Sequence, residues 1–221
     1  MTSTSVAILD NDVTSMTLIA RILQEKLPDC PLRWLETSGY RAIDRCLSAS
    51  TQPDILLCDM SLTDISGPRV CKTIRAQATR PLILAITSFP LSQYASIAAA
   101  SGCQGILEKT CIPAEIAQAV DALTHDRTYR DEANGFETAL ASHNRLRYAN
   151  SQNDQNSHTL TAKEMFIMDK LLEGYTLKEI SEQLHVKDVT VRTHISHIKD
   201  KLQAKNLSQA SIRWFRMREE L

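Results

Sequence analysis

The chain has 221 residues, of which 43% are hydrophobic and 23% are charged, and its formal net charge is -1. This length and composition are typical of a globular protein with one or two domains, and they exclude a disordered or low-complexity chain. The near-neutral total hides a local excess of positive charge, because residues 187–205 contain five Lys or Arg and two Asp or Glu. We therefore expect any binding to a polyanion to involve this C-terminal region.

No stretch of the sequence approaches the roughly 20 apolar residues that a membrane helix needs. The first residues also lack the basic and apolar regions of a secretory signal peptide. The six cysteines all lie within residues 1–124 without Cys-x-x-Cys spacing, which favours buried reduced thiols over a disulfide framework or a metal site. These features predict a cytoplasmic protein that has no membrane partner.

Residues 1–124 alternate between short apolar runs and amphipathic segments. The apolar runs predict strands at 6–9, 32–36, 55–58, 82–86 and 105–107, and the segments between them predict helices at 13–27, 40–47, 68–74, 91–100 and 113–123. Buried strands that alternate with helices are typical of a parallel sheet with helices on both faces. We therefore predict an α/β fold in which a doubly wound, five-stranded parallel sheet places its site at the carboxyl ends of the strands.

Polar side chains follow four of these strands. They are Asp10, Asn11 and Asp12, then Asp59, then Thr87 and Ser88, and finally Lys109. Any one of them alone is more simply explained as a loop residue or a helix cap. Together they offer carboxylates for Mg2+, an aspartate that can attack phosphorus, and a hydroxyl and an ammonium that can hold phosphoryl oxygens. The combination predicts a pocket for a phosphoryl group.

The segment PDILLCDMSLTDISG resembles the phosphoacceptor loop of receiver domains in two-component response regulators, and the resemblance extends over the whole strand and helix pattern above. It implies a flavodoxin-like fold in which Asp59 is phosphorylated and Thr87 and Lys109 contact the phosphoryl group. It also implies Mg2+ as the cofactor, held by Asp10, Asp59 and the backbone carbonyl of Ser61. The implied partner is a sensor histidine kinase or a phosphotransfer protein.

The sequence departs from the receiver pattern at three positions. Receivers usually carry a second, metal-binding acid directly after the first, whereas this chain has Asn11, so the implied Mg2+ site is weakened and takes Asn11 or Asp12 as its further ligand. Thr63 replaces the usual loop proline, and Ile106 stands where most receivers have a switch aromatic residue. An alternative interpretation is therefore a regulator that is not phosphorylated and responds to a protein partner docking on the receiver.

A catalytic alternative rests on Asp10, Asp12 and Thr14. Their Asp-x-Asp-x-Thr pattern resembles the nucleophile loop of haloacid-dehalogenase-type phosphatases. That family requires further acids at a strand end after its lysine, and no such acids follow Lys109. We therefore expect a chain that is not an enzyme beyond catalysing the transfer of phosphate onto itself.

Residues 125–157 are expected to be a linker between domains at 1–124 and 158–221. Within the linker, 129–140 predicts a short helix, and 144–157 is rich in Asn, Gln and Ser, which predicts a flexible tether.

The C-terminal region predicts a small all-α domain. Two capping boxes, Thr161 with Glu164 and Thr176 with Glu179, mark the starts of two short helices. A third helix is expected over 188–202, with an apolar side and a side of basic and hydroxyl residues. Its apolar side consists of Val191, Ile195, Ile198 and Leu202.

This region resembles the DNA-binding domain of LuxR-type (NarL-type) bacterial transcription regulators, through LT..E, EGYTLKEI, TVRTH and I..KL. The resemblance implies a helix-turn-helix whose third helix enters the major groove of double-stranded promoter DNA. It assigns base edges to Arg192, Thr193 and Ser196, and phosphates to Lys178, Thr190 and Lys201. Lys187 replaces the serine that usually caps this helix, so Asp188 is the alternative cap.

The complete sequence therefore predicts a DNA-binding transcription regulator of a two-component phosphorelay, with output controlled by phosphorylation of Asp59. A last helix, capped by Ser208, is expected to form a homodimer on DNA.

Overall fold

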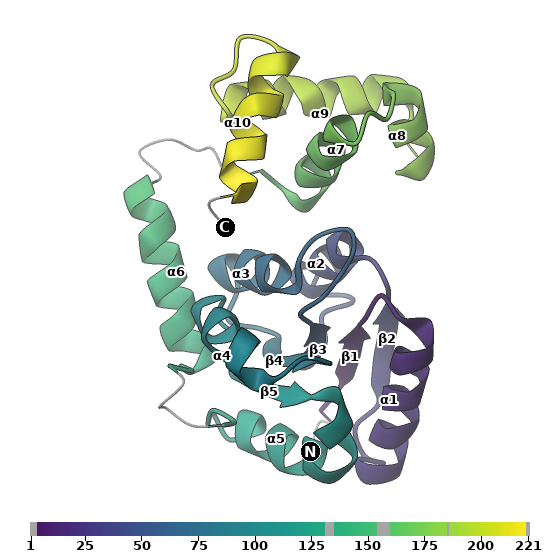
Figure 1. Cartoon of the computed structure of the whole chain (residues 1–221), viewed down its shortest axis with the longest axis vertical. Coiled ribbons are helices and arrows are strands. Elements are labelled where there is room, and N and C mark those ends of the chain that lie inside the picture. The colour runs from purple at the N-terminus through teal and green to yellow at the C-terminus, as the bar shows by residue number, and fades with distance from the viewer. Residues whose placement is uncertain (1–3, 131–134, 154–159, 185, 220–221) are drawn as a thin grey trace. The chain divides into compact units, whose positions relative to one another are not determined.

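The structure is a computed structural model that describes residues 4–130, 135–153, 160–184 and 186–219 (Figure 1). The chain divides into two compact units, Met1–Asn150 and Ser151–Leu221. Within the described parts, no helix is both long enough and apolar enough to cross a membrane.

The first unit is built on a five-stranded parallel sheet with the strand order β2-β1-β3-β4-β5. The strands are β1 (Val6–Leu9), β2 (Leu32–Glu36), β3 (Ile55–Asp59), β4 (Leu82–Thr87) and β5 (Gly105–Glu108). Strands β1, β3 and β4 are buried along their whole length, which explains why the sequence shows them as continuous apolar runs. The predicted five-stranded parallel sheet is confirmed.

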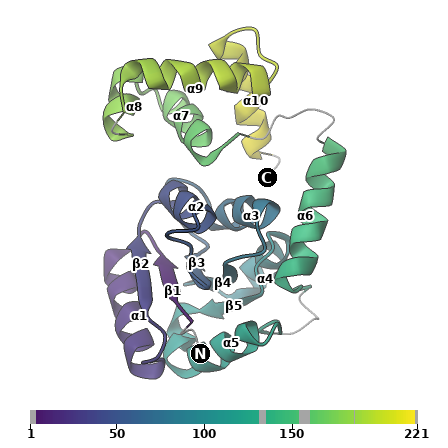
Figure 2. The same ribbon diagram turned by 180° about the vertical axis from the view of Figure 1, so that it is seen from behind.

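Helices cover both faces of this sheet (Figures 1 and 2). Helices α1 (Val13–Lys26) and α5 (Ile112–Thr124) pack together on one face, and α2 (Gly39–Leu47), α3 (Gly67–Gln77) and α4 (Leu91–Ala100) cover the other. A short 3-10 turn, η1 (Lys109–Cys111), leads from β5 into α5. The core beneath α1 and α5 is aliphatic and includes Ile19, Leu57 and Ile116.

The segment after α5 differs from its prediction. Tyr129 pairs with Gly105 beside the sheet, and the next helix is α6 (Ala139–Asn153), so the predicted helix at 129–140 and the predicted tether at 144–157 are both wrong in the parts that the structure describes. Residues 131–134 and 154–157 of these predictions lie outside the described residues.

Helix α6 packs on the first unit through a narrow buried stripe. Ala139, Ser142 and Leu146 are its buried residues, at the i, i+3 and i+7 positions that share one helix face. The guanidinium of Arg145 donates to the carbonyl oxygens of Ala99 and Ala100 at the end of α4, at 3.2 Å each. The described residues 125–130 and 135–149 therefore belong to the first unit instead of forming a linker.

A buried arginine organises the surface on which α6 packs. Arg75 has no exposed surface, and its guanidinium donates to the carbonyl oxygens of Pro81 at 2.7 Å and Gly102 at 3.1 Å. Burial lowers the pKa of Arg75 to about 10, so the group is still charged at neutral pH. Its own carbonyl oxygen lies 2.7 Å from Nδ1 of His143 on α6.

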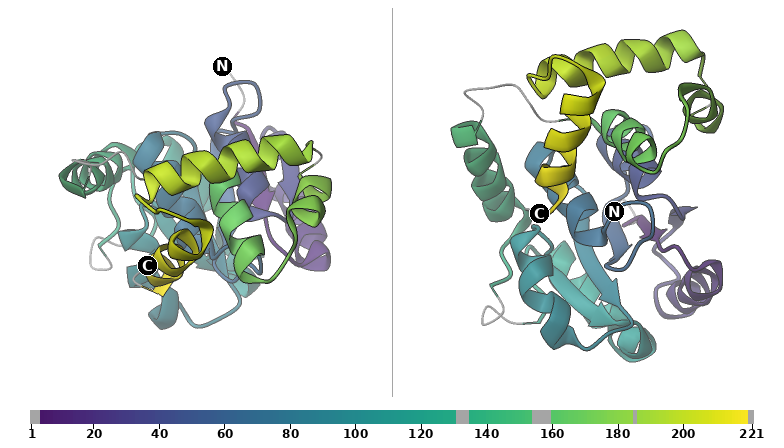
Figure 3. Two further views of the ribbon diagram at one scale, coloured as in Figure 1. Left: turned by 90° about the horizontal axis from the view of Figure 1, so that it is seen from above. Right: turned by 45° about the horizontal axis from the view of Figure 1, so that its top comes forward.

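The described part of the second unit is built from helices (Figure 3). They are α7 (Ala162–Leu172), α8 (Leu177–Gln183), α9 (Asp188–Lys201) and α10 (Leu207–Glu219). Both predicted capping boxes are confirmed at the starts of α7 and α8. Trp214 of α10 fills the core, where its indole Nε1 donates to Oδ1 of Asp169 at 2.6 Å.

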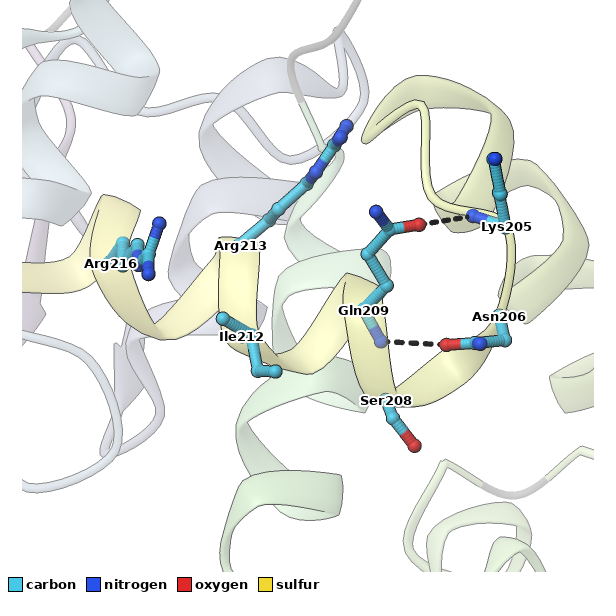
Figure 4. Close-up of a pocket in the computed structure, with 7 residues that line it drawn as sticks. All are labelled: Lys205, Asn206, Ser208, Gln209, Ile212, Arg213 and Arg216. Atoms are coloured by element: carbon cyan, nitrogen blue, oxygen red, sulfur yellow. Dashed lines mark hydrogen bonds between the residues drawn. The ribbon is translucent and has the colours of Figure 1, made fainter.

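Two predicted caps in this unit are wrong. Lys187 is the N-cap residue of α9 without a side-chain cap bond, while Asp188 accepts a hydrogen bond from the Ser181 hydroxyl at 2.6 Å. Helix α10 is capped by Asn206, whose Oδ1 accepts from the backbone N–H of Gln209 at 2.8 Å (Figure 4). Asn206 and Gln209 have the spacing of the two capping boxes, and asparagine caps as well as serine does, so Ser208 is already inside the helix.

Candidate functional site

The register of the sheet brings the predicted site residues to one edge. Leu9 is paired with Cys58, Asp59 with Ile86, and Thr87 with Glu108. Because all five strands are parallel, the residues at or just after their carboxyl ends lie at the same edge. These residues are Asp10, Asp59, Thr87 and Lys109.

Lys109 joins the two aspartates at this edge. Its Nζ lies 2.7 Å from Oδ2 of Asp10 and 3.4 Å from Oδ1 of Asp59. Both carboxylates are buried, so the ammonium offsets part of their mutual repulsion in a poorly hydrated environment. Oδ2 of Asp10 also accepts from the Ser15 hydroxyl at 2.8 Å, which fixes this carboxylate against α1.

The protonation equilibrium of Asp59 is shifted by its surroundings. Burial raises the pKa of Asp59, the nearby Lys109 ammonium lowers it, and the Asp10 carboxylate raises it again, so that the pKa is above its ordinary value. A carboxylate with a raised pKa is more basic and less hydrated, and both properties suit a nucleophile.

The loop after β3 holds Asp59 in place through close packing and hydrogen bonds. A Cβ on Gly67 would lie 2.1 Å from the carbonyl oxygen of Asp59, so only glycine fits at the start of α3. The Asp64 carboxylate accepts from the Ser38 hydroxyl at 2.9 Å and from the Gly39 N–H at 3.2 Å, which ties the loop to the start of α2.

Thr87 and the residues around it are buried or hydrogen-bonded. The Thr87 side chain is fully buried, and its hydroxyl oxygen accepts from the Phe89 N–H at 3.1 Å. Ile106 is buried in β5. The hydroxyls of Tyr94 on α4 and Ser61 in the acceptor loop lie 3.2 Å apart. Sequence reasoning missed Tyr94 and Ser15, because each of these residues lies inside a helix at a position that belongs to no motif.

Two carboxylates, not three, converge at the expected metal site. Asp12 is exposed and caps α1 by accepting from the Thr14 N–H at 2.8 Å, and Asn11 is exposed. Across the described ranges, no cluster of three or more His, Cys, Asp or Glu side chains could hold a metal ion. Asp10 and Asp59 nevertheless fit Mg2+, which needs only one or two protein carboxylates when phosphate oxygens and water complete its shell.

Helix α9 of the second unit presents the predicted base-reading residues. Val191, Ile195 and Ile198 are buried, while Arg192 and Ser196 are exposed on the opposite side. Thr193 is also exposed, and its hydroxyl donates to the carbonyl oxygen of Val189 at 3.0 Å. Within the described part of the second unit, this side of α9 is therefore exposed and can contact another molecule.

The three predicted phosphate contacts differ in their surroundings. Lys178 is exposed at the start of α8, and Thr190 is half-buried. Lys201 is paired within the domain, since its Nζ lies 2.7 Å from Oε2 of the buried Glu164. Burial raises the pKa of Glu164, but hydrogen bonds from Lys201 and Thr161 outweigh this effect and hold the pKa below its ordinary value.

Models of protein families match both units. The response regulator receiver domain matches residues 6–121, which is more than half of the chain. The bacterial regulatory proteins of the luxR family match residues 158–214. The receiver match leaves the phosphatase interpretation of Asp10 and Asp12 without support.

Known relatives and solved structures agree with these matches. The transcriptional regulatory protein LiaR of Bacillus subtilis is 29% identical over 205 residues, which cover 92% of each chain. A structure of the Salmonella typhimurium response regulator RcsB covers 96% of this chain and 97% of that chain, with a TM-score of 0.53 and 19% identity. A structure of two RcsB dimers bound to two parallel DNAs covers 97% and 98%, with a TM-score of 0.50 and 19% identity. The chain thus belongs to the two-component response regulators, as a receiver domain followed by a LuxR-family DNA-binding domain.

Proposed function

We propose that this DNA-binding regulator is controlled by phosphorylation of Asp59. The observation that carries the proposal is the position of the Lys109 ammonium, which lies within ion-pair distance of both Asp10 and Asp59 at the carboxyl edge of the sheet. A cation at this position can hold the phosphoryl oxygens while a carboxylate oxygen attacks phosphorus.

The reaction is the transfer of a phosphoryl group from a sensor histidine kinase, a phosphotransfer protein or acetyl phosphate. A carboxylate oxygen of Asp59 forms the new O–P bond as the bond from phosphorus to the donor nitrogen or oxygen breaks, and the donor leaves with that electron pair. Lys109 and the Thr87 hydroxyl hold the transferred oxygens. Asp10, Asp59 and the Ser61 carbonyl would hold Mg2+, which supplies positive charge for the phosphoryl oxygens when bound.

Intact-mass measurement tests this proposal. We expect the full chain to gain one phosphoryl group in acetyl phosphate with Mg2+, and Asp59→Ala to gain none. Asn11→Asp restores a third carboxylate, so it should reach half-saturation at a lower Mg2+ concentration. Asn144→Asp, which adds the same charge on the exposed side of α6, is the matched control and should behave as the wild type.

The same experiment distinguishes a second candidate function. Within the described residues no third acid joins Asp10 and Asp59, and a receiver whose Mg2+ site were too weak for phosphorylation would be controlled by a docked protein partner. If the wild type gains no phosphoryl group while Asn11→Asp does, this second function replaces the first.

For the output, we propose that α9 enters the major groove of promoter DNA and that two chains bind together as a homodimer, as in the RcsB structure with DNA. The exposed Arg192, Thr193 and Ser196 support the groove contact, and Lys178 and Thr190 would contact phosphates. The protein would act in the cytoplasm, where kinase and promoter are both accessible. Lys201 would contact a phosphate only after its ion pair with Glu164 breaks.

A further inference from the structure

The DNA-facing side of α9 carries an exposed apolar group that the proposed contacts do not use. Val189, in the first turn of the helix, is 64% exposed although it is a branched aliphatic residue. Thr193 follows four residues later, so the two side chains are neighbours on the same face. A singly exposed apolar side chain is common on protein surfaces, so its neighbours decide whether it forms a contact surface.

Thr193 adds a methyl group to this surface. Its hydroxyl is already used, because it donates to the Val189 carbonyl oxygen at 3.0 Å. The hydroxyl oxygen can still accept a hydrogen bond, and the γ-methyl is the apolar group that Thr193 offers to an outside contact. Together the Val189 side chain and the Thr193 methyl form what we call the apolar strip of α9.

The charges around the strip identify its occupant. Lys187 and Arg192 are exposed on either side of Val189 in the sequence, and residues 187–205 carry a net positive charge. An apolar strip with exposed cations nearby in the sequence fits a polyanion that carries small apolar groups. In the major groove of DNA the apolar group is the thymine 5-methyl, between two rows of phosphates.

We propose that the apolar strip of α9 packs on thymine methyl groups, so that Val189 is a specificity-determining residue. This inference rests on the proposed entry of α9 into the major groove. It implies operator half-sites in which thymine lies close to the guanine that Arg192 can pair with.

The test removes single methyl groups from the DNA. The full-length chain first enriches binding duplexes from a random library, and each thymine of the enriched duplex is then replaced by deoxyuridine, which lacks only the methyl group. Burial of one methyl group is worth about a fourfold change in affinity, so we expect about fourfold weaker binding at one or two thymines. This loss should disappear in Val189→Ser at one of these positions.

Three variants separate the methyl contact from other effects. Thr193→Ser keeps the hydroxyl and should lose sensitivity to deoxyuridine at the neighbouring thymine, whereas Thr193→Val keeps the methyl and should retain it. Val13→Ser is the matched control, since Val13 is 60% exposed in the first turn of α1 in the other unit. Val13→Ser should bind the thymine duplex and the deoxyuridine duplexes with the same affinities as the wild type.

Two results would overturn the inference. If the wild type enriches a sequence but no deoxyuridine replacement weakens binding, or if the loss persists in Val189→Ser at every sensitive thymine, Val189 does not read thymine although α9 still binds DNA. If the wild type enriches no sequence at all, the proposed entry of α9 into the groove fails, and the inference fails with it.

Discussion

The buried carboxylate of Asp59 lowers the free energy of unfolding of the first unit. The carboxylate is 3% exposed and lies near Asp10, and these surroundings raise its pKa. A raised pKa in the folded state means that the unfolded state releases this proton more easily. The ionised carboxylate therefore destabilises the fold at any pH above its folded pKa.

We predict that Asp59→Asn stabilises the first unit at pH 7. Lys109 keeps Asp10 as its partner in this variant, so no cation is left unpaired. The Tm should rise by a few degrees, since about 1 kcal/mol corresponds to about 2–4 °C in a unit of this size. The gain should shrink as the pH falls through the raised pKa, because wild-type Asp59 then becomes protonated. Thermal unfolding over a series of pH values from 7 downward measures both effects.

The control for this prediction is Asp29→Asn at an exposed position, which should leave the Tm unchanged throughout the pH series. A gain for Asp59→Asn that is equal at every pH of the series would contradict ionisation as its cause.

At the scale of elements, α6 is held mainly by bonds to backbone atoms. Arg145 donates to two carbonyl oxygens at the end of α4, and His143 contacts the carbonyl oxygen of Arg75 on α3. These carbonyls belong to the last turns of their helices, where intrahelical partners are missing. Helix α6 therefore adds side-chain donors at the ends of α3 and α4, where the Ala99 carbonyl oxygen also accepts from the Gly102 N–H at 3.0 Å.

We predict that Arg145→Ala loosens α6 without unfolding the sheet. The backbone amides of α6 should exchange hydrogen at least tenfold faster, because loss of two charged hydrogen bonds lowers the free energy of local opening by more than about 1.4 kcal/mol. Hydrogen-exchange mass spectrometry of the full chain measures this directly. Asn144→Ala, at an exposed position of the same helix, should exchange as the wild type does, and equal exchange in Arg145→Ala would mean that Arg145 does not hold α6.

The difference between α6 and the strands explains how far sequence alone could predict the fold. Strands such as Ile55–Asp59 are buried on both faces, so their apolar runs are visible without tertiary information. The buried stripe of α6 contains Ala139, Ser142 and only one large apolar residue, Leu146, and its anchors are carbonyl oxygens, which every residue type has. No residue pattern could reveal these contacts.

The site shows the same division. Asp10, Asp59, Thr87 and Lys109 were predictable because parallel strands bring their ends to one edge, and the ion pairs of Lys109 confirm that three of them meet. The Ser15 bond to Asp10 and the contact between Tyr94 and Ser61 depend on how helices pack on the sheet. The pairing of Lys201 with Glu164 was hidden for the same reason, since 37 residues separate them.

For the whole molecule, affinity and sequence preference should be separable in DNA binding. We predict that Lys178→Ala weakens binding to all duplexes and lowers the slope of log K against log salt by about one, because one phosphate contact is lost. Arg192→Ala should instead change the preferred sequence by relaxing the choice of guanine at one position. Titrations of both variants across a salt series, on enriched and on random duplexes, measure the two effects.

Glu182→Ala, at an exposed acidic position of α8, is the control and should not lower the slope. Identical effects of Lys178→Ala and Arg192→Ala on slope and preference would contradict this division of roles.

The anchoring of α6 also determines where this protein can be recombined with others. Because side chains of α6 contact carbonyl oxygens of α3 and α4, the receiver and α6 should be exchanged together as one module. A chimera that joins a foreign output domain after residue 124 would remove the His143 and Arg145 contacts from the ends of α3 and α4 and would lose the buried stripe around Leu146. A fusion made after Asn153 keeps α6 with the receiver. We therefore expect this junction to let the receiver control a foreign DNA-binding domain and its promoter.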